Sequence, residues 1–257
     1  MIKIDRDNFP PDDKYLIGGN KGNQRWRCAE NKVKSDYLNN PNAFNAANKY
    51  TFPKHPSYEL WRNELLKCQG HKCCYCEKII DKGELEHFRP KNGYKQSKGG
   101  SLNYPGYYWL AYRWKNILLS CGECNDTGRK GNLFPILGVR ALNHKSDLNN
   151  ESCVLINPYE EDPANSISFY KESPISLNAR GRETIDILEL DKRVDLSEAR
   201  KDKFALYETA SLIASLKPTG KISQKDIDKA QNRIQNAVKP KYQFSGMIRE
   251  NLKRGLL

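Results

Sequence analysis

The stretch from Cys73 to Asn125 reads Cys73-Cys74-Tyr75-Cys76, then Glu86-His87-Phe88-Arg89-Pro90, then Asn116, then Cys121-Gly122-Glu123-Cys124-Asn125. It combines two Cys-x-x-Cys pairs with a histidine that directly follows a carboxylate. Cysteine pairs at this spacing are typical of metal sites, and a histidine beside an acidic residue is typical of hydrolytic centres. The stretch therefore predicts a metal-stabilised core with a reactive centre inside it.

The two cysteine pairs predict one structural zinc site. Zinc binds four thiolates tetrahedrally, and two intervening residues let each pair turn back onto a single ion. An ion held this way would close the long loop between the pairs and stabilise a small core without joining the chemistry. Cys74 and His71 are close enough in sequence to be alternative ligands, but neither fits the paired spacing. The predicted ligands are Cys73, Cys76, Cys121 and Cys124.

The residues between and beside the pairs predict a centre for phosphodiester hydrolysis. A neutral histidine can take a proton from water near physiological pH. A hard divalent cation such as Mg²⁺ or Mn²⁺ prefers oxygen ligands and stabilises charge on a phosphoryl group. Glu86 offers a carboxylate and Asn125 a carbonyl oxygen. Because they adjoin His87 and Cys124, the strand and the cysteine turn would direct them to one point.

Composition and charge narrow the class of protein. The 257 residues carry a net charge of +12, with the basic excess in residues 1–135 and 220–257 and a net acidic segment at 136–219. A polyanionic partner such as nucleic acid is the natural interpretation. We hypothesise that the acidic segment docks a protein partner; the alternative is that its helices only pack on the core. The sequence has neither a long apolar run nor a secretory signal at its start, which predicts a cytoplasmic protein without membrane contact.

The pattern along the chain predicts three segments. These are an irregular N-terminal arm at 1–56, a nuclease core with a leading helix at 57–135, and a mainly helical extension at 136–257. Within them, strands are expected at 83–88, 117–119 and 167–170. Helices are expected from about Ser57, at 109–114, from Asn125, at 179–190, from a cap at Asp195, and from a cap at Ser223.

A cluster of aromatic residues precedes Asn116 and has two interpretations. The rings could stack on nucleic-acid bases or pack in the core, and we favour core packing. The residues are Tyr104, Tyr107, Tyr108, Trp109, Tyr112 and Trp114.

The order of these motifs resembles the HNH nucleases, also called ββα-metal nucleases. Within that family, Cys-Cys-Tyr-Cys-Glu, Glu-His-Phe-Arg-Pro-Lys and Trp-Leu-Ala-Tyr-Arg-Trp-Lys-Asn-Ile-Leu-Leu-Ser-Cys resemble the PtuB nucleases of Septu anti-phage systems and their retron-linked relatives. The likeness is strong over residues 70–135, fair over 153–204 and weak elsewhere. It implies an α+β fold: a small zinc-clipped ββα-metal (HNH) core with mainly α-helical extensions.

The resemblance also implies roles for individual residues. His87 corresponds to the general base, Glu86 and Asn125 to the ligands of the catalytic metal, and Asn116 to the residue that steadies the loop carrying the base. The family more often has Asp or His where this chain has Glu86, so the metal position is less firmly implied than the base. Phosphate contacts are expected from basic residues of the motif region: Arg89, Lys91, Arg129 and Lys130.

The function implied by this resemblance is a metal-dependent HNH endonuclease, a phosphodiester hydrolase that acts in anti-phage defence. DNA is the favoured substrate, and a PtuA-like ATPase is the implied partner that controls the nuclease. Two alternatives stay open at this point. The same site could act on RNA such as tRNA, or the chain could be a non-catalytic zinc module that binds nucleic acid or the ATPase.

Overall fold

The computed structural model of the 257-residue chain describes residues 1–5, 25–53, 58–219 and 221–257. The chain forms two compact units. The central unit comprises residues 5–68 and 82–157, and the C-terminal unit comprises residues 1–4, 69–81 and 158–257. The two units interleave along the sequence, and so they differ from the three consecutive segments predicted above.

The central unit contains a two-stranded antiparallel sheet. Strand β1 (Glu84–His87) pairs with β2 (Ile117–Ser120), with Glu86 opposite Leu118 and His87 opposite Ile117. Both strands were predicted. Every residue of β2 is buried, because helix α2 (Tyr58–Cys68) packs against both strands. The expected start of that helix at Ser57 lies outside the described residues.

The helix that follows β2 is shorter and earlier than predicted. Helix α3 spans Gly122–Asn125 and ends at Asn125, where the sequence predicted a helix to begin. The chain turns early because Cys121 takes the N-cap position and its carbonyl accepts from the Asn125 N–H at 3.1 Å. Two further short strands, β3 (Ile136–Leu137) and β4 (Ser152–Cys153), pair elsewhere in this unit.

The prediction of an irregular N-terminal arm is wrong for residues 25–39, which form the 15-residue helix α1 (Arg25–Asn39). A 3-10 turn at Pro41–Phe44 follows it. Its buried positions include Ala29 and Val33, and the ring of Tyr37 stacks on Tyr108 with centroids 4.1 Å apart. One apolar residue per turn is a weak periodic signal, so tertiary packing rather than amphipathicity stabilises this helix.

The aromatic residues before Asn116 form core, as favoured above. The buried members are Tyr107, Tyr108, Trp109, Tyr112 and Trp114. The predicted helix at 109–114 is absent: the segment consists of 3-10 turns at Tyr108–Leu110 and Trp114–Asn116, separated by an extended residue at Arg113. A continuous helix would distribute these rings around its axis, whereas the broken path buries nearly all of them.

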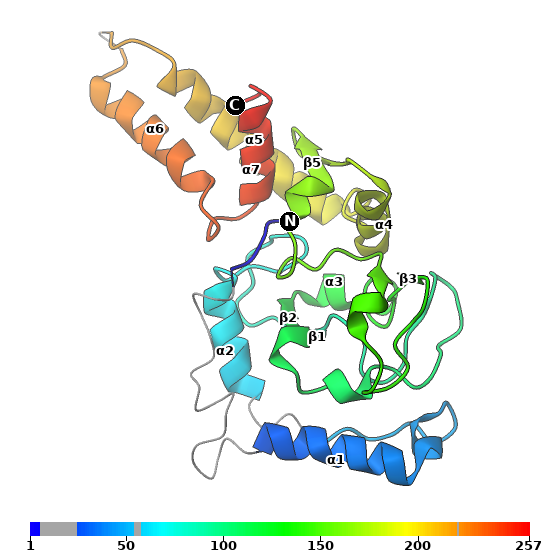
Figure 1. The fold of residues 1–257 in the computed structure, drawn as a ribbon. Helices are drawn as coiled ribbons and strands as arrows, with labels where there is room; N and C mark the ends of the chain where they lie inside the picture. The colour runs from blue at the N-terminus through cyan, green and yellow to red at the C-terminus, as the bar shows by residue number, and fades with distance from the viewer. Residues whose placement is uncertain (6–24, 54–57, 220) are drawn as a thin grey trace. The chain divides into compact units, whose positions relative to one another are not determined.

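The C-terminal unit is mainly helical. Its elements are the hairpin β5 (Ile167–Tyr170) and β6 (Ser173–Ser176), followed by helices α4 (Ala179–Leu188), α5 (Val194–Ala214), α6 (Gln224–Ala237) and α7 (Ser245–Lys253) (Figure 1). Helices α5 and α6 pack against each other, while α7 packs on β5 and α4 on β6. None of the described helices combines the length and hydropathy required to span a bilayer.

The two helix starts predicted from capping residues have different outcomes. Ser223 caps α6 in a capping box with Asp226, as predicted. Asp195 is not a cap, because Arg193 holds the N-cap position of α5 and Asp195 lies in the first turn. There its carboxylate pairs with the Lys78 ammonium at 2.8 Å.

A buried ion pair joins residues 69–81 to α7 within the C-terminal unit. The Lys72 ammonium lies 2.9 Å from the Glu77 carboxylate, and both side chains are 3% exposed. Ser245 of α7 donates to the same carboxylate. Burial alone would raise the pKa of Glu77, but the neighbouring Lys72 holds that pKa well below its usual range. The pair is therefore charged, and breaking it would leave an uncompensated buried charge.

Candidate active site and metal centre

Four cysteine thiols converge as the sequence predicted. Their sulfur atoms lie within 4.8 Å of one another, and all four residues are buried: Cys73, Cys76, Cys121 and Cys124. Zinc–sulfur bonds of about 2.3 Å place the sulfurs of a tetrahedral site about 3.8 Å apart, so the group is close enough to hold a metal ion. Four sulfur ligands are consistent with a structural zinc ion. Among the described residues, it is the only group of three or more His, Cys, Asp or Glu side chains that could hold a metal ion. The alternative ligands Cys74 and His71 are not part of it.

Each cysteine pair sits in a tight backbone turn. The Cys73 N–H donates to the Lys78 carbonyl at 2.9 Å, and the Glu77 N–H donates back to the Cys73 carbonyl at 3.1 Å. The second pair occupies the cap and the third position of α3. All eight cysteines lie in the described part of the chain, and none of them forms a disulfide bond.

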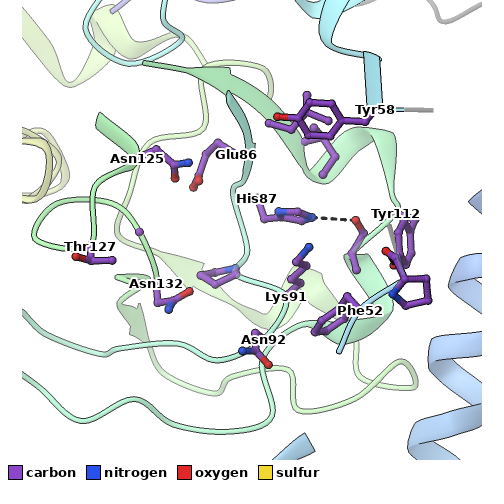
Figure 2. Close-up of a pocket in the computed structure, with 16 residues that line it drawn as sticks. Phe52, Tyr58, Glu86, His87, Lys91, Asn92, Tyr112, Asn125, Thr127 and Asn132 are labelled. Atoms are coloured by element: carbon purple, nitrogen blue, oxygen red, sulfur yellow. Dashed lines mark hydrogen bonds between the residues drawn. The ribbon is translucent and has the colours of Figure 1, made fainter. Parts of the chain in front are cut away.

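His87 ends strand β1 with its imidazole in a pocket of about 490 Å³ (Figure 2). Its Nε2 lies 2.9 Å from the Ala111 carbonyl oxygen. A carbonyl oxygen can only accept, so Nε2 carries the proton and Nδ1 is the basic nitrogen of the neutral ring. The tautomer required of a general base is thus set by the backbone.

Asn116 connects the two segments that hold His87 in place. Its Oδ1 accepts from the Arg89 N–H at 2.9 Å, and its Nδ2 donates to the carbonyls of Arg89 at 3.0 Å and Leu110 at 3.3 Å. Its own carbonyl accepts from the Phe88 N–H at 2.9 Å. The side chain therefore bridges the residues after His87 and the turn that supplies Ala111.

Replacing Asn116 with alanine should destabilise the protein by about 1–3 kcal/mol for each backbone group left without its partner. Chemical denaturation of the purified variant measures the change. Asn149→Ala, at an exposed asparagine of the same unit, should leave the transition midpoint near that of the wild type. Equal midpoints for both variants would show that Asn116 does not brace this loop.

Glu86 is buried and paired with Lys130. Their charged atoms lie 2.7 Å apart, with the side chains 5% and 0% exposed. The Lys130 ammonium also donates to the carbonyls of His87 at 3.3 Å and Gly131 at 3.2 Å. In this arrangement the Lys130 ammonium contacts the Glu86 carboxylate and the backbone carbonyl of His87. The sequence predicts instead that Lys130 contacts phosphate.

Asn125 lies at the rim of the same pocket. Its Nδ2 donates to the Glu84 carboxylate at 2.9 Å, which fixes the amide with its carbonyl oxygen turned away from Glu84. Figure 2 shows the side chains of Asn125 and Glu86 pointing toward one another. One carboxylate and one amide oxygen fit Mg²⁺, which usually keeps several waters and takes its remaining ligands from substrate phosphates.

The other predicted phosphate contacts differ in what they bind. The Arg89 guanidinium pairs with Glu151 at 2.9 Å, a fully buried carboxylate that also accepts from the Tyr107 hydroxyl. Arg129 donates to the Glu123 carbonyl at 3.0 Å. Lys91 lines the pocket beside His87. Sequence reasoning missed Glu151 and the Ala111 carbonyl: the first lies far along the chain, and the second is a backbone group with no sequence signature.

Comparison with known proteins yields a small number of relatives. No family model matches the chain, and no solved structure matches it. A Septu protein PtuB of Bacillus mycoides (strain KBAB4) is 36% identical over 169 residues, or 60% of this chain and 57% of that protein. A Septu protein PtuB of Bacillus thuringiensis is 30% identical over 132 residues, or 50% and 40% of the two chains.

A third relative carries a different name. A Septu protein PtuA of Bacillus mycoides (strain KBAB4) is 28% identical over 171 residues, which cover 65% of this chain and 24% of that protein. The chain spans about half of the length of the PtuB proteins it matches. These similarities show that the chain is close to proteins named Septu protein PtuB.

Proposed function

We propose that the chain is a metal-dependent HNH endonuclease that hydrolyses phosphodiester bonds of nucleic acid, with DNA as the favoured substrate. The observation that carries the proposal is the hydrogen bonding of the His87 ring. Its Nε2 is held by the Ala111 carbonyl, so Nδ1 is the nitrogen that can accept a proton from water. A strand, a strand and a short helix around a four-cysteine group support the HNH interpretation.

Each polar residue of the pocket has a separate role in the proposed reaction. His87 Nδ1 takes a proton from water, and the resulting hydroxide attacks phosphorus. The bond from phosphorus to the leaving sugar oxygen breaks as that oxygen takes a proton from a solvent water. A divalent cation, when bound, stabilises the charge that develops on the phosphoryl and leaving oxygens. Glu86 and Asn125 would hold that cation, and Lys130 keeps the Glu86 carboxylate oriented at 2.7 Å.

We assign the activity to anti-phage defence because the relatives are named Septu proteins. The proposed partner is a PtuA-like ATPase, as the resemblance to PtuB implies. The exposed acidic residues Glu198 and Asp202 of α5 belong to the net acidic segment hypothesised to dock that partner.

A cleavage assay tests the proposal. The purified chain, alone and with the ATPase, is incubated with plasmid DNA, single-stranded DNA and tRNA, with and without added Mg²⁺ or Mn²⁺. We expect cleavage of DNA that requires the added cation. Cleavage of RNA alone would reassign the substrate. No cleavage of any nucleic acid under all conditions would overturn the enzymatic proposal in favour of a non-catalytic zinc module.

A further inference from the structure

Lys91 differs from the other predicted phosphate contacts in its surroundings. Arg89 pairs with Glu151, Lys130 with Glu86, and Arg129 donates to a backbone carbonyl. Lys91 is half-buried, and no carboxylate within the described residues forms an ion pair with it. Its ammonium lies 5.1 Å from the centre of the Phe52 ring, a contact that attracts the cation but supplies no negative counter-charge.

The orientation of the Lys91 side chain is a second reason to expect an anion beside it. Lys91 lines the same pocket as His87, and Figure 2 shows it pointing toward the imidazole. Loss of hydration lowers the pKa of Lys91, the behaviour of an ammonium removed from water without a counter-charge. An anion entering the pocket would supply the missing charge and offset the desolvation cost.

The charges of the residues that line the pocket also favour an anionic ligand. Besides His87, its lining includes one acidic and one basic side chain, those of Glu86 and Lys91. Since Lys130 already neutralises Glu86, the positive charge of Lys91 is left to act on whatever occupies the space beside His87. A phosphate diester is an anion that this ammonium would attract.

We propose that Lys91 is a catalytic residue that binds a non-bridging oxygen of the phosphate attacked by the His87-activated water. The inference rests on the proposed function for its catalytic part. Lys91 would stabilise the extra negative charge that the phosphoryl group gains in the transition state, as positioned cations do in other phosphoryl-transfer sites. The Lys91 ammonium lies 5.1 Å from the centre of the Phe52 ring, and both residues line this pocket.

Single-turnover cleavage by Lys91→Met tests the catalytic part. Methionine keeps an unbranched apolar side chain against Phe52 and removes the charge, so the fold should hold while the rate falls by about 10²–10³-fold. Lys91→Arg, which retains the charge, should recover part of the rate. Lys145→Met, at an exposed lysine outside the pocket, controls for net charge. A wild-type rate for Lys91→Met would overturn the assignment.

A binding measurement separates failure of this proposal from failure of the proposed function. Fluorescence anisotropy of a single-stranded DNA 12-mer, without divalent cation, is compared between His87→Ala and His87→Ala/Lys91→Met. Loss of one phosphate contact should make the negative slope of log K against log salt shallower by about 0.7. An unchanged slope would refute the Lys91 contact even if the wild type cuts DNA. A shallower slope in a protein that cuts nothing would retain the contact and reject only the catalysis.

Discussion

Replacing His87 with alanine is expected to lower the rate of nucleic-acid cleavage by about 10²–10⁴-fold, the usual contribution of a general base. His87 Nδ1 is the basic nitrogen in the pocket because Nε2 is committed to the Ala111 carbonyl at 2.9 Å. No other histidine lines this pocket among the described residues. Cleavage is followed by gel electrophoresis under single-turnover conditions.

A matched control distinguishes loss of chemistry from loss of structure. His144→Ala changes a half-buried histidine of the same unit that lies near the Tyr108 hydroxyl and outside the pocket. This variant should cut at a rate close to the wild type. His87→Ala should retain the wild-type circular dichroism spectrum, because the hydrogen bond from the His87 ring to the Ala111 carbonyl is worth only about 1 kcal/mol. If the alanine variant cuts as fast as the wild type, His87 is not the base and the mechanism fails with it.

The second large effect is expected for the four-cysteine group. Cys121→Ser should reduce the zinc content of the purified protein from about one ion per chain and lower its melting temperature strongly, because structural zinc contributes about 10–16 kcal/mol in small zinc-binding peptides at neutral pH. Its sulfur lies within 4.8 Å of the other three. Mass spectrometry for metals and thermal unfolding measure the two quantities.

Two other cysteines serve as controls for this variant. Cys74→Ser changes a buried thiol beside the first pair that is not part of the group, so zinc content should stay at the wild-type value. Cys28→Ser changes an exposed thiol and should alter neither zinc content nor melting temperature. Wild-type zinc in Cys121→Ser, or loss of zinc in Cys74→Ser, would show that the ligand set is wrong.

Local sequence patterns were sufficient for several elements of the structure. Each Cys-x-x-Cys spacing encodes a turn that returns both sulfurs to one point, so the four ligands could be named in advance. Strands β1 and β2 lie within the motif region as short runs bounded by turns. Ser223 caps α6, as the sequence indicated, because a capping box is a contact within one helical turn. These features depend on residues a few positions apart.

Other features were decided only when distant segments came together. Helix α1 has one buried residue per turn, and its packing against the Tyr108 segment stabilises it. Lys130 and Arg89 resemble surface phosphate contacts in sequence, yet Glu86 and Glu151 pair with them across 44 and 62 positions of the chain. The path through Tyr107–Asn116 is irregular because burial of its rings outweighs helix propensity.

The candidate reactive centre depends on both local sequence patterns and contacts between distant segments. The sequence determined that His87, Glu86, Asn116 and Asn125 are the polar residues of one motif. Tertiary structure decided which nitrogen of His87 faces the Ala111 carbonyl and which basic side chains have a carboxylate partner. The physical reason is that hydrogen bonding and charge pairing depend on the partner that packing brings within about 3 Å, and a carbonyl such as that of Ala111 is present in every residue.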